Sequence, residues 1–309
     1  MRKKILHSPT INEDEKLISV KDELNRVARS VDEYLSKGVC CKDADLEKIY
    51  NSMRYSLLDA GKRIRPFLVI SVAESLGGQA EDAMPFAAAL EMIHTYSLIH
   101  DDLPCMDNDD FRRGKPSNHK AFGEDIALLA GDALLTGAFS VAASSYLPSD
   151  ICVKAIACLS AAAGADGMIG GQLLDLEAEI NLPDEERLRK IYSLKTGALL
   201  RAAAKLGCLA AKITDSAVFE KADRYARNIG TAFQIVDDVL DVCGDEKTLG
   251  KPIGSDEKNG KATFVSFHGI YEARKIASDM TKDAVLSISD FPNNEKLVEL
   301  AYWLLNRQV

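Results

Sequence analysis

Apolar residues recur at spacings of three and four along most of this chain, and that periodicity limits what it can fold into. Residues 13–37 carry such a stripe, which the segment from residue 45 repeats, and further helical segments begin at residues 124, 149, 184 and 215. The segment from residue 83 has Pro85 near its start and an Ala-rich interior, which suits a buried helix. The apolar spacing is typical of helices, whereas no persuasive alternating run or Asn-Gly turn indicates a β-hairpin. The sequence therefore predicts an all-α fold, one large bundle of roughly ten or more helices. No linker rich in Pro, Gly or Ser divides it, so we expect one domain over residues 13–309 after a flexible tail at residues 1–12.

Composition argues against several classes of function. The chain is 47% hydrophobic and 28% charged, and its net charge of -9 argues against a general nucleic-acid binder. Its start lacks the apolar core of a signal peptide, and its apolar stretches are shorter than a membrane span. Seven cysteines, an odd number without CxxC spacing, indicate reduced thiols. We therefore expect a cytoplasmic protein with no membrane span.

Two clusters of aspartates interrupt the apolar pattern. One lies in "DDLPCMD" and the other in "DDVLD", and carboxylates this close repel one another unless a cation neutralises them. Mg2+ prefers oxygen ligands and often shares its shell with phosphate oxygens. Either cluster alone would also fit a solvated acidic face, whereas an EF-hand is a poor fit because its required Gly and Glu are missing. The residues are Asp101, Asp102 and Asp107 in the first cluster, and Asp237, Asp238 and Asp241 in the second.

Basic residues accompany both clusters. Arg binds phosphate bidentately and Lys acts as a point charge, although each of them alone would also fit a solvated surface. His94 fits either a hydrogen-bonded core position or a phosphate donor. Because no nucleophile–base pair accompanies them, the carboxylates and cations together predict a diphosphate bridged to the protein by Mg2+. The cations are Lys62, Arg63, Arg65, Arg112, Arg113, Lys195, Lys251 and Lys261.

In this combination and order, the motifs resemble those of the trans-isoprenyl diphosphate synthases, a family of polyprenyl synthetases. The resemblance rests on "GKRIRP", "DDLPCMD", "GGQLLD", "LKTGAL", "DDVLD" and "GKATF", and extends from about Glu13 to the C-terminus. It implies a helical bundle around a central cavity, usually a homodimer, that uses Mg2+, with Mn2+ as an alternative. It also implies head-to-tail condensation of dimethylallyl or geranyl diphosphate with isopentenyl diphosphate.

The resemblance further implies roles for single residues of these motifs. The catalytic set would be Asp101, Lys195, Thr196 and Gln234, the last two beside the allylic carbocation. Mg2+ would be ligated by Asp101, Asp107 and Asp237, with Asp102, Asp238 and Asp241 as accessory ligands. The allylic diphosphate would be bound by Arg112, Lys195, Thr196, Gln234 and Lys251. Isopentenyl diphosphate would be bound by Gly61, Lys62, Arg65, His94 and Arg113.

Tyr96 is expected to set the length of the product, with Ser97 beside it. It lies five residues before Asp101, about 7.5 Å along a helix, where a ring would close the floor of the pocket; an ordinary core position is the alternative. An aromatic residue there, with the longer first motif, resembles bacterial farnesyl diphosphate synthases. We therefore predict a C15 product, with a C20 geranylgeranyl product as runner-up. A terpene cyclase or a non-catalytic subunit of a heteromeric synthase fits less well, because both aspartate clusters are intact.

Overall fold

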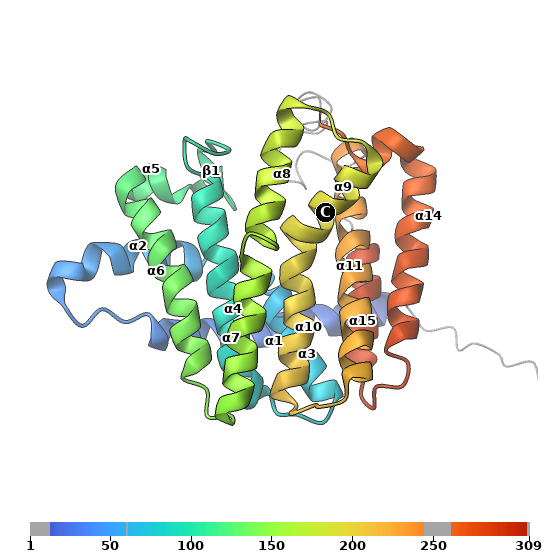
Figure 1. Ribbon diagram of the computed structural model, residues 1–309, viewed down its shortest axis with the longest axis horizontal. Coiled ribbons are helices and arrows are strands. Elements are labelled where there is room, and N and C mark those ends of the chain that lie inside the picture. The colour runs from blue at the N-terminus through green and yellow to red at the C-terminus, as the bar shows by residue number, and fades with distance from the viewer. Residues whose placement is uncertain (1–12, 60, 244–260, 308–309) are drawn as a thin grey trace, which may run out of the picture.

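The chain forms a bundle of helices in the computed structural model, which describes residues 13–59, 61–243 and 261–307 (Figure 1). The predicted all-α fold is confirmed. The helices of the first half are α1 (Glu13–Gly38), η1 (Ala44–Leu46), α2 (Glu47–Leu57), α3 (Ile64–Ser75), α4 (Ala80–Asp101), α5 (Asn118–Phe122) and α6 (Glu124–Ala143). Those of the second half are α7 (Ser149–Ala163), α8 (Met168–Ile180), α9 (Glu185–Ile191), η2 (Tyr192–Thr196), α10 (Gly197–Ala210), α11 (Ser216–Cys243), α14 (Phe264–Ser287) and α15 (Glu295–Leu305).

Helix α10 lies at the centre of the bundle. It packs against α3, α4, α7 and α11, and α11 packs in turn against α14. The long helices α4, α6, α8, α10, α11 and α14 run in similar directions, and α1 crosses behind them (Figure 1). Most of α10 is buried, and Leu199, Ala203 and Leu206 have no exposed surface, whereas Arg201 and Lys205 form a partly exposed polar edge that pairs with Asp223 of α11.

The sequence pattern did not reveal helices α3, α5, α14 and α15, and it did not reveal a two-residue hairpin. Strands β1 (Phe111–Arg112) and β2 (Lys115–Pro116) pair antiparallel. Arg113 (φ 52°) and Gly114 (φ 79°) form the turn, and positive φ at both positions is the type I′ geometry. The expectation of no hairpin was wrong because Arg stands where Asn usually marks such a turn.

The helical segment predicted from residue 149 onward is two helices. Helix α7 ends at Ala163 and α8 begins at Met168, with Gly164 and Gly167 between them. Gly171 allows α8 to approach η2 closely, since a Cβ there would lie 2.2 Å from the backbone nitrogen of Lys195. The small residues of "AGADGMIGGQ" thus permit close helix packing.

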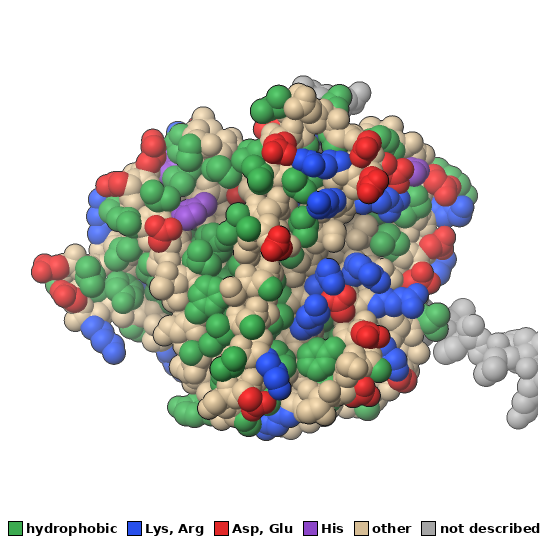
Figure 2. Space-filling view, in the orientation of Figure 1, with side chains coloured by type: hydrophobic (Ala, Val, Ile, Leu, Met, Phe, Trp, Pro, Cys, Tyr) green, Lys and Arg blue, Asp and Glu red, His purple; other side chains and the backbone are tan. Residues whose placement is uncertain are grey.

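Two helical segments are apolar and long enough to cross a membrane by length and composition alone, contrary to the expectation from the sequence. They are Glu124–Ala143 and Ser149–Ile180, and only 33% and 39% of their apolar windows are buried in this chain. The first carries the 60% exposed side chain of Asp132 and the second is broken between α7 and α8, and both features disfavour a span. Hydrophobic side chains gather on the surface where α6 and α7 lie (Figure 2). The absence of a membrane span stays a prediction.

Gly207 tests the tight packing around α10. A Cβ there would lie 2.6 Å from the carbonyl oxygen of Val69 and 2.6 Å from the Cβ of Val72, both on α3. We expect Gly207→Ala to lower the free energy of unfolding by about 2 kcal/mol, because neither neighbour can move aside freely. Gly38→Ala is the control, since nothing lies within 4 Å of a Cβ at the end of α1. Equal losses in urea denaturation of the two variants would contradict the packing argument.

Candidate active site

A cavity of about 650 Å³ opens between α4, α6, α8 and η2. Its walls combine apolar side chains, among them Leu135 of α6 and Leu173 of α8, with charged groups from α4 and η2. A mostly apolar cavity with a few convergent polar groups is typical of a small-molecule site. The predicted site residues that line it together are Arg65, His94, Tyr96, Ser97, Asp101, Lys195 and Thr196.

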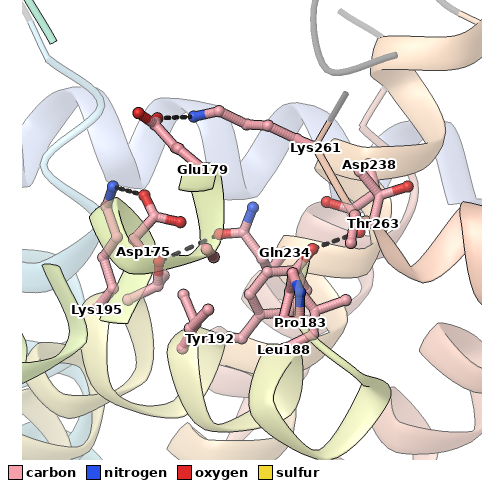
Figure 3. A pocket seen from close by; sticks show the side chains of 14 residues that line it. Asp175, Glu179, Pro183, Leu188, Tyr192, Lys195, Gln234, Asp238, Lys261 and Thr263 are labelled. Atoms are coloured by element: carbon pink, nitrogen blue, oxygen red, sulfur yellow. Dashed lines mark hydrogen bonds and ion pairs between the residues drawn. The ribbon is translucent and has the colours of Figure 1, made fainter. Parts of the chain in front are cut away.

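Lys195 and Thr196 also line a second pocket, of about 210 Å³, which Gln234 and Asp238 of α11 enter from the other side (Figure 3). Lys195 and Thr196 belong to η2, a single π-helical turn, and such turns are frequent at functional sites. The Nζ of Lys195 lies 2.5 Å from Asp175 Oδ2, and the Thr196 hydroxyl donates to Gln234 Oε1 at 3.1 Å. The structure thus brings Thr196 and Gln234 together, as predicted.

In the first cluster, Asp101 is the aspartate whose ionised form is destabilised most. It is the last residue of α4, and its carbonyl oxygen accepts the backbone N–H of Asp107 at 2.9 Å, which keeps the two residues adjacent. Burial raises the pKa of Asp101 to about 6, and repulsion from Asp107 adds to the effect while Lys195 opposes it. The pKa of Asp107 is raised as well, chiefly by desolvation, although this residue stands more exposed at the loop.

Asp102 faces away from that pair, into the protein. Its side chain is 3% exposed and accepts Arg112 Nε at 2.9 Å, while a second guanidinium nitrogen of Arg112 contacts the same oxygen. Consecutive side chains on a helix point about 100° apart, so Asp101 and Asp102 cannot share a ligand easily. The predicted roles of Asp102 on a metal and of Arg112 on a diphosphate stay predictions, and in this structure the two residues bind each other.

The second cluster divides in the same way. Asp238 is buried and accepts the Tyr192 hydroxyl at 2.7 Å and the backbone N–H of Phe264 at 2.8 Å. Asp241 is buried as well, at 2% exposure. Asp237 is 38% exposed and pairs with Arg307. Asp238 therefore ties α11 to Tyr192 and Phe264 at the edge of the smaller pocket, and Asp237 is the more exposed of the two neighbouring carboxylates.

The donor set fits a cation that is shared with a ligand. Within residues 13–59, 61–243 and 261–307, no group of three His, Cys, Asp or Glu side chains could hold a metal ion unaided. Asp101 and Asp107 are nevertheless adjacent carboxylates with raised pKa values, which a divalent cation would relieve. Mg2+ commonly takes one or two carboxylates and completes its shell with water and phosphate oxygens. The residues present therefore fit Mg2+ bound together with a phosphorylated substrate.

Cationic side chains surround His94. Burial lowers the pKa of His94 well below its usual value, and repulsion from Arg65 and Arg113 lowers it further. The pKa values of these two arginines are themselves lowered, first by burial. Gly61 makes room for one of them, since a Cβ would lie 2.9 Å from Arg113 Nη1. Glu91 compensates this positive charge only in part, and an anionic ligand would neutralise the rest.

Of the three basic residues in "GKRIRP" only Arg65 lines the cavity, and Lys251 lies outside the described residues. Lys62 is exposed, with its Nζ 5.3 Å from the ring centre of Trp303. Arg63, next to it, is buried in ion pairs with Glu91 and Asp32 and cannot reach a ligand without breaking them. Lys251 lies in the segment 244–260, outside the described residues.

Several residues of the site could not be recognised from the sequence. Asp175 pairs with Lys195. It is the last residue of the motif "GGQLLD", which could have marked it as a site residue, but the sequence alone assigned it no role. Gln172 of the same motif lines the cavity with an amide nitrogen that has no partner among the described residues. Arg307 contacts Asp237 although 70 residues separate them, and no local pattern could have revealed that contact.

Comparison with known proteins supports this arrangement. Residues 46–301 match the polyprenyl synthetase family. A geranylgeranyl diphosphate synthase of Cyanophora paradoxa is 49% identical over 263 residues, which cover 84% of this chain and 87% of that protein. A farnesyl diphosphate synthase of Micrococcus luteus is 44% identical over 263 residues, covering 84% of this chain and 89% of that protein.

A solved structure leads to the same family. An FPP/GFPP synthase from Zymomonas mobilis has a TM-score of 0.84 at 34% identity and covers 94% of this chain and 99% of its own. The helical bundle and its cavity thus define the class as an all-α isoprenoid synthase. The chain belongs to the polyprenyl synthetase family and is a prenyl diphosphate synthase, a prenyltransferase.

The raised pKa of Asp101 predicts a pH-dependent gain in stability on its removal. Because the native pKa of about 6 exceeds the ordinary 3.8, ionised Asp101 lowers stability above pH 6 and has no effect below pH 3.8. In EDTA, Asp101→Asn should therefore raise the free energy of unfolding at pH 8 by about 2 kcal/mol, and leave it unchanged at pH 3.5.

Asp110→Asn is the matched control, because Asp110 is exposed and its pKa is lowered by a hydrogen bond from Lys120. It should show no gain at pH 8. Denaturant unfolding at both pH values measures the two variants, and a loss of stability in Asp101→Asn at pH 8 would contradict the desolvation argument.

Proposed function

We propose that this chain condenses isopentenyl diphosphate with dimethylallyl diphosphate and then with geranyl diphosphate, and that it stops at the C15 product, farnesyl diphosphate. The observation that carries the proposal is the position of Tyr96 in the wall of the cavity that Asp101 and Lys195 also line. A bulky ring below the reacting end of a growing apolar chain would limit its length.

Tyr96 is held firmly. It is 4% exposed, and its ring packs edge-on against His100 with 5.6 Å between centroids. Its hydroxyl oxygen is buried without a hydrogen-bond partner among the described residues, and burial raises the pKa of Tyr96 to about 12. The phenol therefore stays neutral and presents a rigid barrier rather than a binding group.

The charged residues would form two binding sites, one for each diphosphate. Arg65, His94 and Arg113 would take isopentenyl diphosphate, and Lys195 would take the allylic one after exchanging its contact with Asp175. Asp101, Asp107 and Asp237 would hold Mg2+, which supplies Lewis-acid stabilisation of the charge that develops on pyrophosphate.

The reaction would proceed in three steps. The allylic C–O bond breaks as pyrophosphate leaves, the isopentenyl double bond attacks the carbocation, and the condensed cation loses a proton to the released pyrophosphate. Thr196 donates its proton to Gln234, which leaves the lone pairs of the Thr196 oxygen available to face the positive charge. The cavity keeps the substrates together and away from water.

The deciding experiment incubates the purified chain with isopentenyl diphosphate, Mg2+ and a C5, C10 or C15 allylic diphosphate. We expect C15 product from the C5 and C10 partners, no extension of the C15 partner, and no turnover in EDTA. A C20 product would select the second candidate, which the similarity to the Cyanophora paradoxa geranylgeranyl diphosphate synthase favours. A cyclic hydrocarbon would indicate a terpene cyclase, and no turnover with any partner would indicate a non-catalytic subunit.

Tyr96→Ala tests the origin of the chain length. Removing the ring should deepen the cavity, so that the main product becomes C20 or longer while the first condensation continues. Tyr271→Ala is the control, because Tyr271 is 83% exposed on α14 and does not line the cavity. Product analysis by chromatography separates the outcomes, and an unchanged C15 profile in Tyr96→Ala would show that this ring does not set the product length.

We also infer that the chain forms a homodimer through α6 and α7. Leu129 and Val153 are 51% and 64% exposed on these helices, next to other apolar side chains, and apolar surface of this extent favours a protein partner. Light scattering should give twice the chain mass of 33.7 kDa. Leu129→Glu should shift the mass toward one chain, whereas Leu182→Glu, at an exposed site in the loop before α9, should not.

A further inference from the structure

The side chain of Arg307, just beyond the end of α15, reaches back to the second aspartate cluster. Its guanidinium contacts Oδ1 of Asp237 and lies 4.0 Å from the ring centre of Phe233. Phe233 and Asp237 are four residues apart on α11, so one guanidinium covers both on one face of the helix. The Arg307 side chain is only 12% exposed. A cation near the end of the chain is thus drawn in against a predicted metal ligand.

The way Arg307 is bonded differs from that of the structural arginines. Arg63 donates to three acceptors, and Arg201 makes a two-point contact with Asp223 at 2.9 Å for each bond. The Nε of Arg307, in contrast, is buried with no hydrogen-bond partner among the described residues. Its site therefore does not satisfy the whole guanidinium, and this lowers the cost of leaving it.

We propose that Arg307 is an exchangeable counter-ion, which neutralises Asp237 when no divalent cation is bound and leaves the carboxylate when one binds. The proposal rests on the proposed function, in which Asp237 is a metal ligand. An oxygen that accepts a guanidinium N–H must give up that contact to coordinate a hard cation at the same position, and the two positive charges repel each other.

Lys62 strengthens the competition. Its pKa is lowered, first by desolvation and then by repulsion from Arg307, whereas Asp237 raises it. Two protein cations thus already surround this carboxylate. A divalent cation binds there more weakly than it would beside an isolated aspartate, and the negative charge of a bound diphosphate compensates for the difference. Arg307 would in this way make cation binding at the second cluster depend on the substrate.

The chain carries its own reporter of this exchange. Trp303 is the single tryptophan among the 309 residues. It lies on α15, four residues before Arg307, with the Lys62 ammonium over its ring. Movement of the Arg307 guanidinium away from Asp237 changes the charge and the contacts near this indole, so its fluorescence should change when a cation binds.

The test uses the full chain without substrate and Mn2+ as the probe, with free Mn2+ measured by electron paramagnetic resonance and Trp303 fluorescence followed in parallel. Arg307→Gln should bind Mn2+ about fivefold more tightly than the parent chain, because a competing cation has gone. Arg307→Lys keeps the charge and should stay within about twofold of the parent. Arg26→Gln, which removes an exposed ion pair with Glu23 on α1, is the matched control and should not change the affinity.

The fluorescence change of the parent chain should shrink in Arg307→Gln at saturating Mn2+, which a merely structural role of Arg307 would not cause. Equal or weaker Mn2+ binding by Arg307→Gln would overturn the exchange. So would a failure of Arg307→Gln to bind Mn2+ while the parent chain still turns over prenyl substrates, and that result would leave the proposed function standing. Loss of prenyl transfer by the parent chain itself would instead overturn the proposed function.

Discussion

The geometry of the site depends on a buried ion pair at the start of α3. The Arg63 side chain has no exposed surface and reaches Glu91 of α4 at 2.7 Å and Asp32 of α1 at 2.7 Å. It also donates to the carbonyl oxygen of Leu57 at the end of α2. Removing one partner of a buried pair commonly costs about 3–5 kcal/mol, so three helices are fixed to the loop before α3. Because Arg63 turns inward, its neighbours are directed elsewhere, Lys62 to the C-terminal segment and Arg65 to the cavity.

The same division recurs in both aspartate clusters. Asp102 is bound by Arg112 and Asp238 by Tyr192, whereas Asp101 and Asp237, the residues before them, lie toward the cavity and toward Arg307. Helical geometry separates neighbouring side chains by about 100°, so a pair of like charges cannot serve one ligand equally. One member holds the helix end in position, and the other is presented with a charge that the protein only partly neutralises.

The sequence predicted the helical segments that become α4, α6 and α8 around the cavity, because they follow local patterns, but it did not reveal α3, α14 or α15. The Ala-rich interior and Pro85 sufficed for α4, and the motif residues Asp101, Lys195 and Thr196 do line one cavity. It did not reveal which aspartate of each cluster is bound by the protein itself, because Tyr192 and Asp238 are 46 residues apart. The hairpin escaped for a different reason, since Arg113 adopts positive φ where the usual signal is Asn. Tertiary contacts decide both features.

Backbone strain marks the surroundings of the site. Of the four non-glycine residues with positive φ in the described part of the chain, Arg63, Asn108 and Arg113 lie beside the cation wall or the first aspartate cluster. Such conformations cost about 1–3 kcal/mol each and persist only where the neighbouring structure enforces them. Arg63 is enforced by its ion pairs, and Arg113 by the hairpin and by the space above Gly61. These strained conformations hold several cations close together when no ligand is bound. The cost of their mutual repulsion is met during folding, and an anionic ligand would reduce that repulsion when it binds.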